Sequence, residues 1–177
     1  IIFSVVSILL AGGCSSVNEN SLQNRVMQLA KSTAISMISD LDGTFAAIDA
    51  GREPYQDIDN PQRYVYVYDM ELTVVAHPFG VERGSSHAER KDANGKNYPQ
   101  LMLSRALARK KGQSGWMEYT EGGYKRIAYY ELAQGRNGLY YIVVSTTPIS
   151  ESNNTGGNSR ASPNEIQILR AYKRMQQ

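Results

Sequence analysis

The 177-residue sequence contains one cysteine, two histidines and almost no net charge. A single cysteine cannot form an intramolecular disulfide, so disulfide staples are excluded. The histidines, His77 and His87, and the one thiol do not form a zinc cluster or a Cys–His catalytic arrangement. A formal charge of +2 argues against nucleic-acid binding, because that affinity depends on neutralised phosphates.

The sequence also lacks the residue constellations on which enzymes depend. It shows no nucleophile with its base, no paired carboxylates with separated roles and no Gly-rich phosphate loop. We therefore expect no catalytic residues, no cofactor and no metal. Asp92, Asn94 and Gly95 predict a tight turn, and their similarity to part of a calcium loop is weak because further carboxylate ligands are missing.

One long apolar stretch is present, IIFSVVSILLAGGC, at the start of the sequence. Small residues directly before Cys14 give it the order of a bacterial lipoprotein signal, which it resembles. We expect residues 1–13 to be a lipoprotein signal peptide, Cys14 to be lipidated and residues 14–21 to be a tether. The protein would then lie on the periplasmic or extracellular side of a bacterial envelope, anchored to the membrane. The alternative is an uncleaved membrane helix or buried segment with an incidental cysteine.

Residues 22–150 carry the patterns of one folded domain. Apolar residues from Leu22 to Ile48 recur at steps of three and four, which predicts one long amphipathic helix ended by Gly51. YVYVY and TVVAHP predict a hairpin, QLMLSRALARKKG a short helix, and GWMEYTE, YKRIAYYEL and GLYYIVVSTTPI three further strands. This order predicts an α+β fold of PAS-like architecture with a five-stranded antiparallel sheet.

The C-terminal part has a different composition. Residues 151–165 are rich in Ser, Asn and Gly, which predicts a flexible linker. Residues 166–177 predict a short C-terminal helix or tail, and the sequence does not indicate what it contacts.

The succession of YVYVYD, VVAHP, KDANGK, a helix ending in KKG, SGWMEY, KRIAYYE and LYYIVVSTTPI resembles the single Cache domain of bacterial chemoreceptors and sensor kinases. The resemblance extends from about Leu22 to Ile149. It implies a long N-terminal helix on one face of the sheet and a ligand pocket on the other, roofed by a loop and a short helix. The family usually continues into a transmembrane helix and a cytoplasmic signalling module. From this sequence we expect a lipid-anchored binding or accessory protein instead.

Recognition of a small carboxylate needs a fixed cation, hydroxyl or amide donors and an apolar wall. Arg126 matches the family's basic position before a strand tyrosine, and we predict that it binds the carboxylate. Lys125 is the alternative if the register differs by one residue. A surface cation on an exposed strand would look the same in the sequence. Alternation places Arg126 on one face with Ala128 and Tyr130.

Tyrosines and a tryptophan supply the other predicted contacts. Tyr64 and Tyr66 share a strand face and are predicted to offer phenolic donors, with ordinary sheet packing as the alternative. Trp116 is predicted as the pocket wall or as a core aromatic. Strict alternation puts Tyr119 on the other face from Trp116, so both line one pocket only if the strand bulges.

Three more residues complete the predicted ligand-binding set. His77 is predicted to hydrogen-bond the ligand or to respond to pH near its ordinary pKa, the alternative being a structural role. Tyr98, after the polar loop, is predicted to cap the pocket, and Tyr129 belongs to the same set.

The sequence thus predicts a domain that captures a small anionic metabolite, a carboxylate or an amino acid, without chemistry. The alternative is a structural or protein-interaction lipoprotein with a Cache-like fold and no ligand. The expected partners are the ligand, the membrane through the lipid, and a second copy through the N-terminal helix or an unidentified signalling protein. A binding pocket should leave buried polar groups that need a ligand or water, whereas a scaffold should fill that space with side chains.

Overall fold

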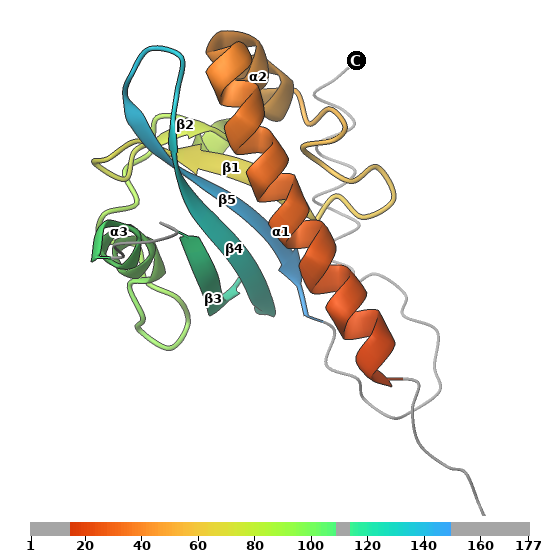
Figure 1. Cartoon of the computed structure of the whole chain (residues 1–177). Helices are drawn as coiled ribbons and strands as arrows, with labels where there is room; N and C mark the ends of the chain where they lie inside the picture. Colours follow the sequence, from red (N-terminus) through yellow and green to blue (C-terminus); the bar gives the residue numbers. More distant parts are fainter. Residues whose placement is uncertain (1–14, 109–113, 150–177) are drawn as a thin grey trace, which may run out of the picture.

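The computed structural model describes residues 15–108 and 114–149 (Figure 1). The expected signal peptide, Cys14, the 151–165 linker and the 166–177 segment lie outside these residues. The described elements are, in chain order, α1 (Ser15–Ser39), α2 (Leu41–Asp49), β1 (Tyr64–Tyr68), β2 (Val74–Ala76), the 3-10 helix η1 (Gly80–Glu82), α3 (Tyr98–Ala108), β3 (Ser114–Glu121), β4 (Tyr124–Gln134) and β5 (Tyr140–Pro148).

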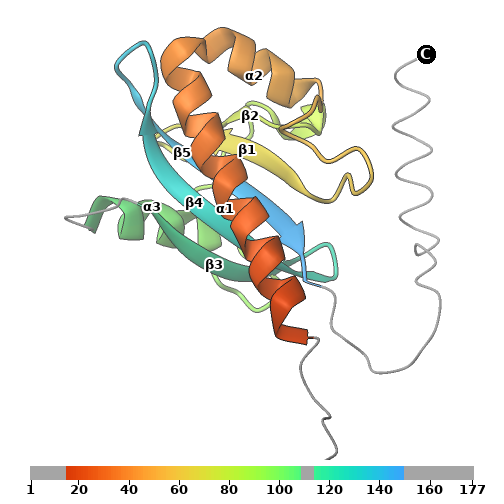
Figure 2. The same cartoon turned by 45° about the vertical axis from the view of Figure 1, so that its right-hand side comes forward.

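The five strands form one antiparallel sheet in the order β2-β1-β5-β4-β3. The predicted α+β fold is confirmed. Helix α1 crosses one face of the sheet, over β4 and β5, and α3 lies against the other face beside β3 (Figures 1 and 2). Because both faces are covered, every residue of β1 is buried.

The predicted long N-terminal helix is two helices. α1 begins at Ser15, so residues 15–21, expected as a tether, are helical; they contain no Gly or Pro, and extending an existing helix costs little. Asp40 then adopts an extended conformation, with φ −147° and ψ 94°, and accepts a hydrogen bond from the Gly43 N–H at 3.0 Å. Asp40 is thus the N-cap of α2 and separates it from α1. The apolar residues keep the same spacing on both sides of Asp40, so the spacing alone does not reveal that the helix is interrupted there.

Each face of the sheet has its own apolar core. Val26, Ala30 and Met37 of α1 pack on the face that carries Val65 and Val67. The tyrosines of β1 point to the opposite face, where α3 covers them. None of the described helices has both the length and the apolar character that crossing a membrane requires.

Candidate ligand-binding site

Aromatic rings fill the sheet face opposite α1. Tyr64, Tyr66 and Tyr68 are alternate residues of β1 and therefore point the same way, with neighbouring ring centroids 6.1 and 5.1 Å apart. Tyr98 of α3 stacks on Tyr119 of β3, with centroids 4.0 Å apart and planes 8° from parallel. We call the following residues the aromatic cluster: Tyr64, Tyr66, Tyr68, His77, Phe79, Tyr98 and Tyr119.

Arg126 of β4 lies beside this cluster and is only 2% exposed. Its Nη2 donates to the backbone oxygen of Gln62 at 2.6 Å and its Nη1 to the Gln62 side-chain oxygen at 3.1 Å. Its Nε donates to Thr146 Oγ1 at 3.3 Å, and its guanidinium carbon lies 5.0 Å from the Tyr64 ring centroid. Among the described residues no carboxylate pairs with it. A buried cation without a counter-charge is unfavourable, so an anion would be a stabilising partner here.

The acidic groups near the cluster are already paired. Arg90 contacts Glu82 at 2.7 Å and Glu121 at 2.9 Å, and the Tyr98 hydroxyl donates to Glu121 at 2.9 Å. Burial alone would raise the pKa of Glu82, but Arg90 and His87 outweigh burial and lower it. Arg90 thus pairs with both carboxylates, and neither of them forms an ion pair with Arg126.

His77 is buried among the rings of Tyr64, Tyr66 and Phe79. Its Nδ1 accepts a hydrogen bond from the Phe79 N–H at 2.9 Å, and its own backbone N–H donates to Asp49 at 2.9 Å. Burial lowers the pKa of His77 to about 3, so the ring is neutral at physiological pH. The Phe79 N–H thus already uses the Nδ1 acceptor, and burial moves the pKa of His77 far below its ordinary value.

Two phenolic hydroxyls on this face, those of Tyr66 and Tyr130, are buried without a hydrogen-bond partner of good geometry in the part of the chain that the structure describes. The Tyr66 hydroxyl lies near those of Tyr68 and Tyr119. Burial raises the pKa of Tyr66, which keeps the hydroxyl protonated and able to donate. The face therefore combines a cation without an ion-pair partner and a buried hydroxyl without a hydrogen bond of good geometry.

The structure brings together five of the predicted ligand-binding residues: Tyr64, Tyr66, His77, Tyr98 and Arg126. It separates two others. Trp116 and Tyr129 pair across β3 and β4, with ring centroids 5.1 Å apart, and Tyr129 belongs to the core under α1. Trp116 and Tyr129 therefore lie on the opposite sheet face from Arg126. Lys125 is exposed and pairs with Glu118 at 3.0 Å, so the cation of the cluster face is Arg126.

Two residues of this site were not in the predicted ligand-binding set, Tyr119 and Gln62. Tyr119 pairs with Arg126 across the hairpin, and its hydroxyl lies 3.0 Å from Thr146 Oγ1. The Gly122-Gly123 turn fixes the register that places Tyr119 there, so the sequence carries a signal for it. Gln62 has no comparable signal, because its contact depends on the path of a loop.

The turn predicted at Asp92 is confirmed. Asp92 Oδ1 accepts the N–H groups of Asn94 and Lys96 at 2.8 and 2.9 Å, and Gly95 has a φ of 79°. The other oxygen, Oδ2, accepts the N–H of Thr120 at 3.2 Å, which ties the turn to β3. Within the described ranges no group of three or more His, Cys, Asp or Glu side chains is placed to hold a metal.

A family model described as single Cache domain 2 matches residues 17–134, more than half of the sequence. The chain belongs to this family. The match confirms the expected family and includes α1, the loop over the aromatic cluster and the strand that carries Arg126.

Solved structures agree with a Cache fold. One, the periplasmic sensor domain of a chemotaxis protein, has a TM-score of 0.57 at 19% identity and covers 78% of this chain and 100% of its own. A second, a Cache chemosensory domain described as recognising carboxylic acids, has a TM-score of 0.53 at 19% identity with the same coverage. A methyl-accepting chemotaxis protein from Vibrio parahaemolyticus has a TM-score of 0.52 at 14% identity, covering 77% of this chain and 91% of its own. No curated protein matches the chain.

Proposed function

We propose that this Cache domain binds a small carboxylate at its aromatic cluster and performs no chemistry on it. The observation that carries the proposal is Arg126, a buried guanidinium for which no described carboxylate serves as partner. A ligand carboxylate would supply an ion-pair partner through the two Arg126 N–H groups that Gln62 and Thr146 do not use. One structural neighbour is a Cache chemosensory domain that recognises carboxylic acids, which supports the same ligand class here.

The existing ion pairs favour a plain carboxylate over an amino acid. An amino acid also needs an acidic partner for its ammonium group, and Glu82 and Glu121 are both held by Arg90. The Tyr66 hydroxyl and the surrounding rings would provide a donor and an apolar wall. Because Tyr98 stacks directly on Tyr119, the ligand enters only when the roof formed by α3 and residues 79–97 moves.

Thermal unfolding of the full chain tests this function, using a panel of small carboxylates, amino acids and amines. A ligand present at a hundredfold excess over its Kd stabilises the folded state by about 2.7 kcal/mol, so a selective rise in Tm of several degrees is expected. Arg126→Ala should abolish the rise in a protein that still unfolds cooperatively. Arg105→Ala, an exposed arginine on α3, is the matched control and should keep it. Ligand-induced stabilisation that persists in folded Arg126→Ala would reject the site.

A second function is supported by the close packing of the same face. The Tyr98–Tyr119 stack and the buried β1 tyrosines fill space that a preformed pocket would leave open. This favours a structural or protein-interaction lipoprotein without a small-molecule ligand. Absence of any Tm shift across the panel, from a well-folded sample, would establish this alternative.

For both proposed functions, the surface that contacts a protein partner is proposed to lie on α1. Ile35 and Ile38 are 66% and 60% exposed on this helix, and neighbouring apolar side chains in water favour a contact with a second copy or a signalling protein. Sedimentation of the full chain at increasing concentration distinguishes the two. A dimer that dissociates in Ile35→Glu would identify a second copy as the partner. A monomer at all concentrations would leave a signalling protein as the remaining candidate partner for this surface.

The lipid anchor on Cys14 is proposed from the sequence pattern, with an extracytoplasmic location of the domain. Mass spectrometry of the protein expressed in a bacterium with lipoprotein processing tests it. Acylated Cys14 at the mature N-terminus is the expected product. Retention of residues 1–13 with a free thiol would show an uncleaved segment instead.

A further inference from the structure

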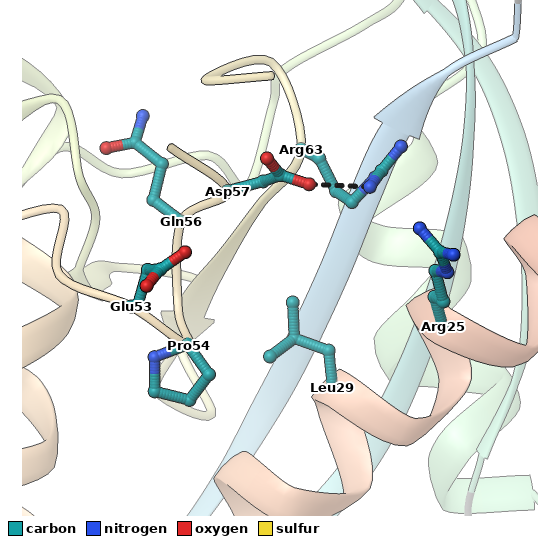
Figure 3. Close-up of a pocket in the computed structure, with 7 residues that line it drawn as sticks. All are labelled: Arg25, Leu29, Glu53, Pro54, Gln56, Asp57 and Arg63. Carbon is teal, nitrogen blue, oxygen red and sulfur yellow. Dashed lines mark hydrogen bonds and ion pairs between the residues drawn. The ribbon is translucent and has the colours of Figure 1, made fainter. Parts of the chain in front are cut away.

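A hollow lies on the α1 side of the sheet, between α1 and the segment that joins α2 to β1 (Figure 3). Its volume is about 400 Å³, within the range of small-molecule sites. Arg25 and Leu29, one helical turn apart, contribute from α1, and Glu53, Pro54 and Asp57 contribute from the connecting segment. None of these residues belongs to the aromatic cluster.

Arg63, which also lines the hollow, has an unused donor. Its Nη1 pairs with Asp57 Oδ2 at 2.6 Å, and Asp57 Oδ1 accepts the backbone N–H groups of Asp59 and Asn60, both at 2.9 Å. The loop thus fixes Asp57, and Asp57 fixes the guanidinium. The Arg63 Nε is buried and has no hydrogen-bond partner in the described ranges. A buried N–H without an acceptor is unfavourable, and it leaves Arg63 only partly satisfied by Asp57.

Two further charged side chains line the hollow, Arg25 and Glu53. Neither Arg25 nor Glu53 takes part in an ion pair among the described residues. In the view of Figure 3 the guanidinium groups of Arg25 and Arg63 lie to one side of the hollow and the Glu53 carboxylate to the other, with Leu29 between them. The lining therefore presents the unpaired Arg25 and the Asp57-paired Arg63 at one side, the unpaired Glu53 at the other and an apolar stretch in the middle.

We infer that this hollow binds a small zwitterion of about dipeptide size, with its carboxylate at Arg25 and Arg63 and its ammonium group facing Glu53. A simple anion would be repelled by Glu53, and a simple cation by Arg25, which has no ion-pair partner among the described residues. Leu29 and Pro54 would contact the apolar part of the ligand. The site is independent of the carboxylate site proposed at Arg126, because the two share no residue.

Nuclear magnetic resonance of the full chain tests the inference with three probes: L-alanyl-L-alanine, its N-acetyl derivative and its C-terminal amide. The free dipeptide should cause saturable shifts of the Arg25 and Arg63 guanidinium signals, because both side chains line the hollow at the end that takes the carboxylate. The two blocked forms lack one charge each and should bind at least about tenfold more weakly. Equal binding of all three, or no saturable shift, would overturn the inference.

Variants at the two ends of the hollow separate the roles of its charges. Arg25→Gln should weaken dipeptide binding by about tenfold or more, and Glu53→Gln should remove the preference for the free over the N-acetylated form. Both side chains are exposed, so unfolding should be unchanged, and Glu71→Gln is the matched surface control. Folded Arg126→Ala should bind the dipeptide normally. Loss of dipeptide binding in that variant would place the dipeptide at the aromatic cluster and overturn the second site, whatever the outcome for carboxylates.

Discussion

Arg126 binds Gln62 through two hydrogen bonds, one to the backbone oxygen at 2.6 Å and one to the side-chain oxygen at 3.1 Å. Gln62 lies just before β1 and Arg126 lies in β4, and β5 separates these strands in the sheet. The contact therefore crosses a strand and holds the guanidinium beside the Tyr64 ring. It positions the charge of the proposed carboxylate site.

Gln62→Leu should destabilise the protein, because the buried Arg126 Nη1 then loses its side-chain acceptor. A hydrogen bond to a charged group contributes about 1.5–3 kcal/mol, so the free energy of unfolding should fall by about that amount. Chemical denaturation measures it. Gln100→Leu, an exposed glutamine on α3, is the control and should cause little change. Equal stability of the two variants would mean that the contact does not hold Arg126.

The sheet was predictable because its signals are local. The YVYVY alternation gives β1 its bounds, and the glycine pair at 122–123 forces Glu121 opposite Tyr124. That register puts Tyr119 opposite Arg126, and Trp116 opposite Tyr129. The sequence thus contains the evidence that Tyr119, and not Trp116, lies beside the predicted cation.

The remaining contacts depend on the paths of loops. Gln62 and Arg126 are 64 positions apart, and nothing near either residue specifies their pairing. The same holds for Arg90, which reaches Glu82 within its own loop and Glu121 at the end of β3. Local patterns fix secondary structure and faces, whereas these long-range polar contacts follow from how the loop between β2 and α3 folds over the cluster.

Gly115 should tolerate a side chain poorly, and loss of the Tyr130 hydroxyl should relieve part of the clash, because the Tyr130 ring carbons would still lie 3.0 and 3.3 Å from an added Cβ. A Cβ on Gly115 would lie 2.6 Å from the Tyr130 hydroxyl oxygen, which is closer than real contacts allow. Gly115→Ala should therefore lower the free energy of unfolding by about 1–3 kcal/mol. Tyr130→Phe should be close to neutral, since this buried hydroxyl has no partner among the described residues. In the double variant the loss should be smaller than in Gly115→Ala alone, and additive losses in denaturation experiments would contradict the clash.

Arg90 should control the opening of the roof over the aromatic cluster. It joins Glu82 near η1 to Glu121 of β3, and it is half-buried. Arg90→Met leaves two unbalanced carboxylates, so backbone amides in residues 79–97 should exchange at least about tenfold faster, while α1 is unchanged. Hydrogen exchange with mass spectrometry resolves the two regions. Lys125→Met breaks the exposed ion pair with Glu118 and should not affect the roof. Unchanged exchange in Arg90→Met would show that the ring stack alone keeps the roof closed.

Stability should decrease as the pH falls below neutrality, because His77 is buried in its neutral form. Its pKa is about 3 in the folded protein against an ordinary value of 6.5, so between these values the unfolded state binds more protons. The stability that His77 contributes is complete above pH 6.5 and is lost as the pH falls towards 3. Between pH 7.5 and 5 the loss should be about 2 kcal/mol.

His77→Asn isolates this effect, since an amide oxygen replaces Nδ1 as the acceptor for the Phe79 N–H and does not titrate. Urea denaturation at both pH values should show a clearly smaller loss in this variant. Burial and Arg90 also lower the pKa of His87, which accounts for a residual slope of the same sign. A pH dependence as steep in His77→Asn as in the parent chain would mean that His77 is not the group whose protonation is resisted by folding.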